Sequence, residues 1–424
     1  MTKLSSIRGF TSASSGGGSS TSWNRRDLQT YGPDSGWSSS STYDFQMRTA
    51  GGMKNNKFVA LRGETNSPSN QTRLRACPFQ VNTSTGAISL LTGQYTIWTN
   101  SSYPGWSTTH WTSPEGTGAF FYGGNIGWPG QSSYYFGYGY GYINSSGNCS
   151  NDSYSTSNAD HGYNQWNQSV PTGGKNGTSG YIVTAGYNAS ASSRAQWRKS
   201  QWTGSSWSVG GLNNPSSNTS TSYSVCMIAN PDANVTGNEL VDVCIYQDGS
   251  SNPKIRAVAA NGNDTEHSVT GSQDSQLMMF QMDDGSVISY SSIYGTMKWS
   301  SYSSKSNLTY SWPYAFTNHT SGFGLGNNRF VVGMSNSSWV GNNENILLCE
   351  INPTTGAVTE LEWGPTSTTK DGFFPLRSSY CRGWPVWASD SDTTPTHIVF
   401  IRCPGNAKTV VASYDWPFTY DLSS

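Results

Sequence analysis

Short runs of β-branched and aromatic residues recur along the chain, separated by polar stretches rich in Ser, Gly, Asn and Thr. The apolar positions show almost no 3.6-residue period, and turn residues bound the runs. Strands have this length and these boundaries. The pattern therefore predicts an all-β protein.

The central residues of seven such runs mark a repeat. The markers are Phe58, Phe120, Ile182, Val225, Met278, Phe330 and Ile398. Successive markers lie 43 to 68 residues apart, near the ~40–50 residues of a propeller blade with extended loops. A second strand is expected after each marker, at residues 72–82, 132–143, 193–202, 239–247, 286–292, 344–352 and 407–414.

A barrel or a sandwich would also suit strands of this length. A small sheet that repeats seven times, however, needs neighbours on both faces to bury its apolar sides. We therefore predict a β-propeller of seven blades.

Two segments 270 residues apart support the repeat. Residues 79–91 (FQVNTSTGAISLL) align without gaps with residues 349–361 (CEINPTTGAVTEL). Both contain an Asn-x-x-Thr-Gly turn, whose glycine supplies the positive φ that a hairpin loop of three to five residues requires.

The two ends of a propeller chain usually pair within one blade. We expect the C-terminal residues 397–421 to supply strands and residues 40–47 (SSTYDFQM) to supply the missing one. Residues 1–23 form a Ser/Gly-rich segment without a core-forming pattern, which we interpret as an extended N-terminal arm. Residues 24–424 are then a single propeller domain, and Ile7, Arg8 and Phe10 are the candidate partner contacts of the arm.

Composition excludes several classes. Charged residues make up 12% of the chain, about half the ~25% usual for soluble domains. The net charge is −1 and the basic residues form no stripe, so nucleic acid is not an expected partner. No run of ~18 apolar residues predicts membrane insertion, and residues 1–20 do not resemble a secretory signal.

The sequence contains no motif that predicts catalysis, a cofactor or a metal. Nucleophile elbows, dinucleotide fingerprints and P-loops are missing, the five histidines are dispersed, and the seven cysteines form no CxxC pair. The loop that begins at Asp232 resembles part of a calcium loop, but Val243 stands where the bidentate acid belongs. The pairs Asp283/Asp284 and Asp390/Asp392 are interpreted as turn residues. We therefore expect no catalytic, cofactor-binding or metal residues, and no enzyme.

Aromatic residues are the remaining signal. The candidates for a glycan-binding or partner-binding surface are Trp106, Trp111, Trp128, Tyr138, Tyr140 and Tyr142. Strict alternation places the three tyrosines on one face of a strand, where amphipathic rings give contact area at low entropy cost. Packing between blades is the alternative.

The low-charge Ser/Gly/Asn/Tyr/Trp composition, the start without a leader and the Ser/Gly-rich arm resemble virion proteins of tailed bacteriophages, in particular neck, tail and fibre-associated components. The resemblance implies a non-enzymatic structural component of a virus particle, assembled in the host cytoplasm. Its arm would dock onto other virion proteins, and its surface would serve assembly or adsorption to a host glycan. The alternative is a soluble, extracellular carbohydrate-binding propeller (a lectin), followed by a glycan-degrading enzyme.

Overall fold

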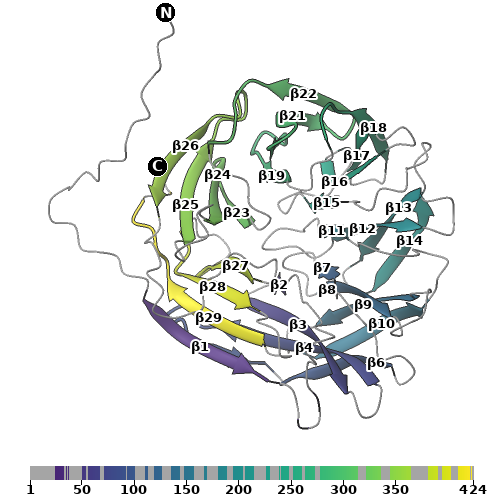
Figure 1. The fold of residues 1–424 in the computed structure, drawn as a ribbon. Coiled ribbons are helices and arrows are strands. Elements are labelled where there is room, and N and C mark those ends of the chain that lie inside the picture. Colours follow the sequence, from purple (N-terminus) through teal and green to yellow (C-terminus); the bar gives the residue numbers. More distant parts are fainter. Residues whose placement is uncertain are drawn as a thin grey trace, which may run out of the picture.

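In the computed structural model of the chain, the described residues form seven antiparallel sheets around a common centre (Figure 1). The structure describes residues 24–32, 35, 37, 50–53, 56–66, 71–91, 93–100, 110–112, 119–126, 135–143, 148–156, 167–169, 180–188, 194–203, 206–213, 226–229, 238, 240–247, 252–259, 263–272, 277–313, 321–335, 344–363, 381–389, 394–402, 409–420 and 422.

We number the sheets as blades 1 to 7 in chain order, each from its innermost to its outermost strand. Blade 1 contains β2 (Ala50–Met53), β3 (Lys57–Asn66), β4 (Gln71–Val81), β5 (Ile88–Leu90) and β6 (Tyr95–Asn100). Blade 2 contains β7 (His110–Thr112), β8 (Ala119–Ile126), β9 (Tyr135–Ile143) and β10 (Cys149–Thr156). Blade 3 contains β11 (Asn167–Ser169), β12 (Gly180–Asn188), β13 (Arg194–Trp202) and β14 (Trp207–Asn213).

Blades 4 to 7 continue the ring. Blade 4 contains β15 (Cys226–Ala229), β16 (Leu240–Gln247), β17 (Pro253–Ala259) and β18 (Asp264–Ser268). Blade 5 contains β19 (Leu277–Gln281), β20 (Val287–Ser291), β21 (Gly295–Ser301) and β22 (Ser304–Leu308). Blade 6 contains β23 (Ser321–Gly326), β24 (Arg329–Ser335), β25 (Glu344–Ile351) and β26 (Val358–Trp363). Blade 7 contains β27 (Cys381–Val386), β28 (His397–Arg402), β29 (Thr409–Asp415) and β1 (Arg25–Tyr31).

The innermost strands contact one another in sequence from β2 through β7, β11, β15, β19 and β23 to β27. Blade 7 meets blade 1 through contacts of β29 with β3 and β5, and one apolar cluster includes Phe58 of blade 1 and Trp384 of blade 7. The sheets therefore follow one another around a ring, and the all-β propeller predicted from the sequence is confirmed.

The expected closing strand was wrong. Residues 25–31, and not residues 40–47, supply the outermost strand of blade 7, where β1 pairs antiparallel with β29. Figure 1 shows β1 beside β29, so that the two ends of the described chain share one sheet. The sequence RRDLQTY carries little apolar alternation because most of its side chains are exposed or half-buried. Residues 40–47 lie outside the described residues.

A strand follows each marker at the expected residues, although its place in the blade varies. In blades 1, 2, 3, 6 and 7 the marker lies on the second strand of its blade, and the strand expected after it is the third. In blade 5 Met278 lies on the innermost strand β19, so the expected strand there is the second. The strand expected after Val225 is likewise the second of blade 4.

Aromatic side chains fill the seams between blades. Phe58 and Trp384 lie 6.2 Å apart (ring centroids) between blades 1 and 7. Phe330 and Phe280 lie 4.9 Å apart between blades 6 and 5. Each pair buries a flat ring against the neighbouring sheet, which is how a four-stranded blade covers the apolar face that it cannot bury alone.

Within the described residues, no helix has the length and hydrophobicity needed to cross a bilayer.

Candidate functional site

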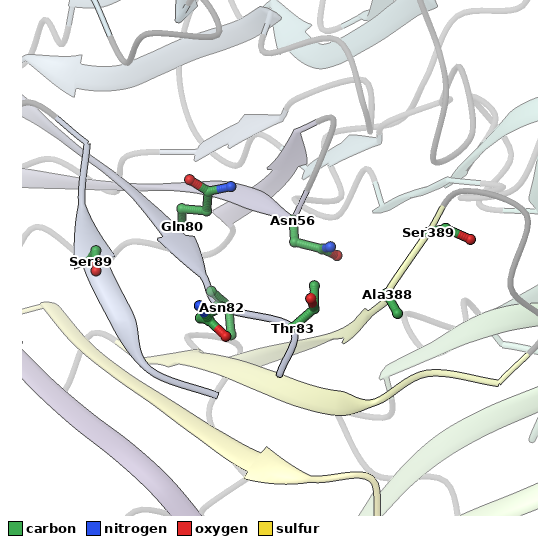
Figure 2. Close-up of a pocket in the computed structure, with 8 residues that line it drawn as sticks. Asn56, Gln80, Asn82, Thr83, Ser89, Ala388 and Ser389 are labelled. Carbon is green, nitrogen blue, oxygen red and sulfur yellow. The ribbon is translucent and has the colours of Figure 1, made fainter. Parts of the chain in front are cut away.

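A cavity of about 550 Å³ opens at the seam between blades 7 and 1. Its lining residues are Asn56, Gln80, Val81, Asn82, Thr83, Ser89, Ala388 and Ser389. Blade 1 supplies the first six from its turns and outer strands, and the segment after β27 supplies the last two. Figure 2 shows the blade 1 residues lying across from Ala388 and Ser389. We call this cavity the seam pocket.

Asn56 joins the two walls of the seam pocket. It lies in the turn between β2 and β3 with a φ of 54°, a left-handed conformation that asparagine tolerates better than most residues. Its Oδ1 accepts a hydrogen bond of 2.9 Å from the Trp387 amide, and its Nδ2 donates to the Trp387 carbonyl. One side chain thus fixes the end of β27 against blade 1.

The turn at residues 82–86 forms the second part of the blade 1 wall. Asn82 Oδ1 accepts hydrogen bonds of 2.9 Å from the amides of Ser84 and Thr85, which shapes the loop in the manner of an Asx turn. Gly86 has a φ of 72°, and its carbonyl accepts a hydrogen bond from the Ser413 hydroxyl of blade 7. The turn is therefore held both by itself and by the neighbouring blade.

Three hydrogen-bonding groups of this wall remain unused within the described part of the chain. They are the Nδ2 of Asn82 and the hydroxyls of Thr83 and Ser89. Asn82 and Ser89 are exposed and Thr83 is half-buried. A polar molecule in the seam pocket can therefore reach all three.

An ion pair closes the ring beside the turn. The Arg26 guanidinium on β1 donates to both carboxylate oxygens of Asp415 at 2.5 and 2.7 Å. His397 lies with its Nε2 3.7 Å from the same carboxylate, and its Nδ1 lies 2.9 Å from the Thr396 hydroxyl. These residues connect β1 to β29 and β28 within blade 7.

The environment sets the charges of this cluster. Burial lowers the pKa of His397, and the Arg26 charge lowers it further against the opposing effect of Asp415. Burial alone would raise the pKa of Asp415, but hydrogen bonds from Arg26 and Asn24 and the Arg26 charge outweigh it and lower the pKa. At neutral pH the cluster holds a neutral imidazole next to a paired carboxylate and guanidinium.

A second seam, between blades 5 and 6, has the same asparagine and the same type of turn, which together we call the seam frame. Asn328 lies in the turn between β23 and β24 with a φ of 54°, and its Oδ1 accepts a hydrogen bond of 2.8 Å from the amide of Asp283, just beyond β19. The turn at residues 352–356 has the hydrogen bonds of the turn at 82–86. Its Gly356 carbonyl accepts 2.7 Å from the Tyr290 hydroxyl of blade 5. Two seams are thus built on one plan.

Charged side chains occupy the second seam. Lys298 Nζ donates to the Pro353 carbonyl at 2.6 Å and lies 3.3 Å from the Asp284 carboxylate. By contrast, the eight residues that line the seam pocket carry no ionisable side chain. The pocket can therefore exchange neutral hydrogen bonds with a ligand but cannot neutralise a ligand charge.

The site residues expected from the sequence fall elsewhere. Ile7, Arg8, Phe10, Trp106 and Trp128 lie outside the described residues. Trp111 lies on β7 and the three tyrosines on β9 of blade 2, and the positions of their side chains are also outside the described part. Tyr138, Tyr140 and Tyr142 do occupy alternate positions of one strand. Their role as a glycan or partner surface stays a prediction.

The residues of the seam pocket were missed, although a signal for them was present. The sequence NNKF at residues 55–58 recurs as NNRF at residues 327–330. Together with the Asn-x-x-Thr-Gly repeat, it marks both turns of each frame. Asn, Thr and Ser in turns, however, read as loop formers and not as the lining of a site.

Among the described residues, no group of three or more His, Cys, Asp or Glu could hold a metal ion. Asp283 and Asp284, expected to be turn residues, do lie in the turn between β19 and β20. Cys349 is a buried free thiol, and burial raises its pKa to about 12.

No protein-family model matches the sequence, and a search of curated proteins finds no significant match. Among solved structures, the chain resembles a virginiamycin B lyase from Staphylococcus aureus at 12% identity, with 91% of this chain and 99% of that chain covered and a TM-score of 0.37. It resembles a putative 6-phosphogluconolactonase from Bacteroides uniformis at 10% identity, 74% and 84% coverage and a TM-score of 0.41. The NanB sialidase from Streptococcus pneumoniae is similar at 9% identity, 88% and 69% coverage and a TM-score of 0.43.

These findings overturn two expectations from the sequence. A non-enzymatic structural component of a phage particle was expected, but the similar structures are named as a lyase, lactonases and sialidases. Both the structural role and the exclusion of enzyme activity were therefore wrong. The inference of a phage structural role failed because it was drawn from amino-acid composition, which describes the character of a protein surface and not the chemistry of a site. At 8–12% identity the likeness concerns the fold alone, so any function must be argued from the seam pocket.

Proposed function

We propose that this propeller binds a neutral saccharide in the seam pocket. The observation that carries the proposal is the chemistry of the lining, which has no ionisable side chain and presents the Asn82 amide and the hydroxyls of Thr83 and Ser89 to a ligand. Amides and hydroxyls both donate and accept hydrogen bonds, as sugar hydroxyls do.

Size and charge support the same ligand class. A cavity of about 550 Å³ lies within the ~300–1,000 Å³ typical of small-molecule sites. A charged ligand would lose hydration without gaining a counter-ion from the lining, which is costly for an ion. A neutral ligand with several hydroxyls incurs no such cost.

The test is a binding titration by calorimetry with D-glucose, D-galactose, D-mannose and N-acetyl-D-glucosamine. We expect at least one of them to bind with one site per chain. Ala388→Tyr places a ring at the exposed wall of the pocket and should abolish that binding. Thr359→Tyr, at the exposed blade 6 position that corresponds to Ser89, should leave it unchanged.

Absence of binding for the whole panel would contradict the proposal, as would equal binding by Ala388→Tyr. The incubated saccharide is then analysed by mass spectrometry for cleavage or elimination products, which records turnover in the same samples.

A further inference from the structure

The two seams can be aligned residue by residue. Trp387 and Asp283 correspond because each has its main chain held by the asparagine of the following blade. Ala388 therefore corresponds to Asp284. From these two residues, the strand pairing can be followed across the second strand of each blade. It leads to Ser413 on β29 in blade 7 and to Lys298 on β21 in blade 5, so Ser413 corresponds to Lys298.

The blade 1 and blade 6 walls align through the repeat of 270 residues. Thr83 corresponds to Pro353 and Gln80 to Glu350. Both Gln80 and Glu350 lie on the third strand and pair with the basic residue that follows the asparagine, Lys57 or Arg329.

The Lys298 ammonium therefore spans a gap whose counterpart is the seam pocket. It bonds to the Pro353 carbonyl on one wall and approaches the Asp284 carboxylate on the other. Their counterparts, Thr83 and Ala388, both line the seam pocket. In the seam between blades 7 and 1, the residue corresponding to lysine is Ser413, which is buried and turned to the Gly86 carbonyl.

We infer that the seam between blades 5 and 6 is a second copy of the saccharide pocket that Lys298 occupies internally, and that a sugar hydroxyl in the seam pocket takes the place of this ammonium by donating to the Thr83 carbonyl. The inference rests on the proposed function. It adds the ligand chemistry: a hydroxyl donor and not an ammonium, because Ala388 stands where Asp284 balances the lysine.

The decisive variant opens the second seam. Lys298→Ser combined with Asp284→Ala gives blade 5 the residues that blade 7 carries at the corresponding positions. Lys298 is mostly buried and Asp284 is half exposed, and the change removes a side chain without inserting one. The opened seam keeps Glu350 and Pro353, so calorimetry with the neutral saccharide that binds the wild-type chain should then show a second, weaker site per chain beside the first. Asp264→Ala with Lys254→Ser, which removes two charges from blade 4, is the matched control and should keep one site.

A second variant alters the seam pocket itself. Gln80→Glu on β4, combined with Thr83→Pro in the turn that follows, places the blade 6 residues Glu350 and Pro353 at the corresponding positions of blade 1. We expect binding of the neutral saccharide to weaken about tenfold or more, because the variant removes the Thr83 hydroxyl as a hydrogen-bonding partner and adds a carboxylate to the pocket wall.

D-Glucosamine, whose amine is protonated at neutral pH, should bind the wild-type chain more weakly than N-acetyl-D-glucosamine. One site in the opened variant, together with unchanged affinity in the Gln80→Glu/Thr83→Pro variant, would overturn the inference and leave the proposed function standing. Absence of saccharide binding by the wild-type chain would overturn both.

Discussion

The seams between blades 7 and 1 and between blades 5 and 6 share an asparagine at positive φ, an Asn-x-x-Thr-Gly turn and a carbonyl of the turn glycine bonded to a hydroxyl of the preceding blade. They differ in what lies between the walls. One seam holds the Lys298 ammonium beside the Asp284 carboxylate, and the other holds a cavity lined by neutral polar groups. A repeated frame therefore provides the shape, and a few substituted side chains decide between an internal ion pair and a ligand site.

The largest effect on this comparison is expected from a methyl group on the turn glycines. A Cβ on Gly86 would lie 2.6 Å from Arg26 Cβ and 2.9 Å from His397 Cδ2, so Gly86→Ala combines a steric conflict with an unfavourable positive φ. We expect it to lower the free energy of unfolding by about 2–5 kcal/mol in denaturant titrations.

Gly356→Ala is the matched change in the other seam, and its nearest contacts, at 2.9 and 3.0 Å, are side-chain ends of Thr296 and Leu308. It should cost less than Gly86→Ala. Gly285→Ala, at a positive φ with open space around it, should cost only about 1–2 kcal/mol. An equal loss in all three variants would show that the close packing of the turns contributes nothing.

The asparagines should differ by one hydrogen bond. Replacement by glycine keeps the positive φ accessible and removes only the side chain. Asn56→Gly loses two bonds to Trp387 and should cost about 2 kcal/mol, whereas Asn328→Gly loses one bond from Asp283 and should cost about 1 kcal/mol. Chemical unfolding of both variants measures the difference, and a larger loss for Asn328→Gly would contradict the assignment.

Acid should weaken the closing blade. The pKa of His397 is lowered below its ordinary 6.5, mainly by burial, so the unfolded chain binds more protons than the folded chain as the pH falls through this range. The free energy of unfolding should therefore decrease below about pH 6.5, and the lowered pKa of Asp415 should add a loss below about pH 4.

Burial also lowers the pKa of His267 in blade 4, which gives a comparison outside the closing blade. His397→Gln and His267→Gln should each reduce the slope of stability against pH between 7 and 5, and the double variant should reduce it most. A slope unchanged by His397→Gln would remove the closing blade from the acid response.

The smallest effect is expected at the internal ion pair. Lys298→Ser should cost about 1 kcal/mol or less, because part of its contribution comes from a solvent-accessible pair with Asp284. The loss should shrink as salt is added, and unfolding measured at low and high ionic strength checks this. A loss that salt leaves unchanged would assign the contribution of Lys298 to the Pro353 carbonyl alone.

Much of the frame could be predicted from the sequence, since the blade repeat and the Asn-x-x-Thr-Gly turns are local patterns. The closing strand could not, because the side chains of β1 are mostly exposed or half-buried and leave little hydrophobic alternation. The shift by one strand in blades 4 and 5 was hidden because apolar runs fill inner and second strands alike.

The seam pocket was beyond sequence patterns for a different reason. Its walls come from residues 331 positions apart, joined by Asn56 and Trp387, and each wall alone is an ordinary polar turn. Only the comparison of NNKF with NNRF at residues 55–58 and 327–330 could have drawn attention to the paired frames. That Ser413 and Ala388 stand in blade 7 where Lys298 and Asp284 stand in blade 5 can be recognised only from the strand register, which a sequence does not give.

Hydrogen exchange measured by mass spectrometry, with and without the saccharide that binds in the calorimetric panel, shows whether a neutral saccharide binds between blades 7 and 1 and not between blades 5 and 6. We expect slower exchange in peptides that cover residues 80–89 and 386–389, with no change in peptides that cover 350–359 and 282–286. Protection confined to the second pair of peptides, or to neither pair, would contradict this expectation.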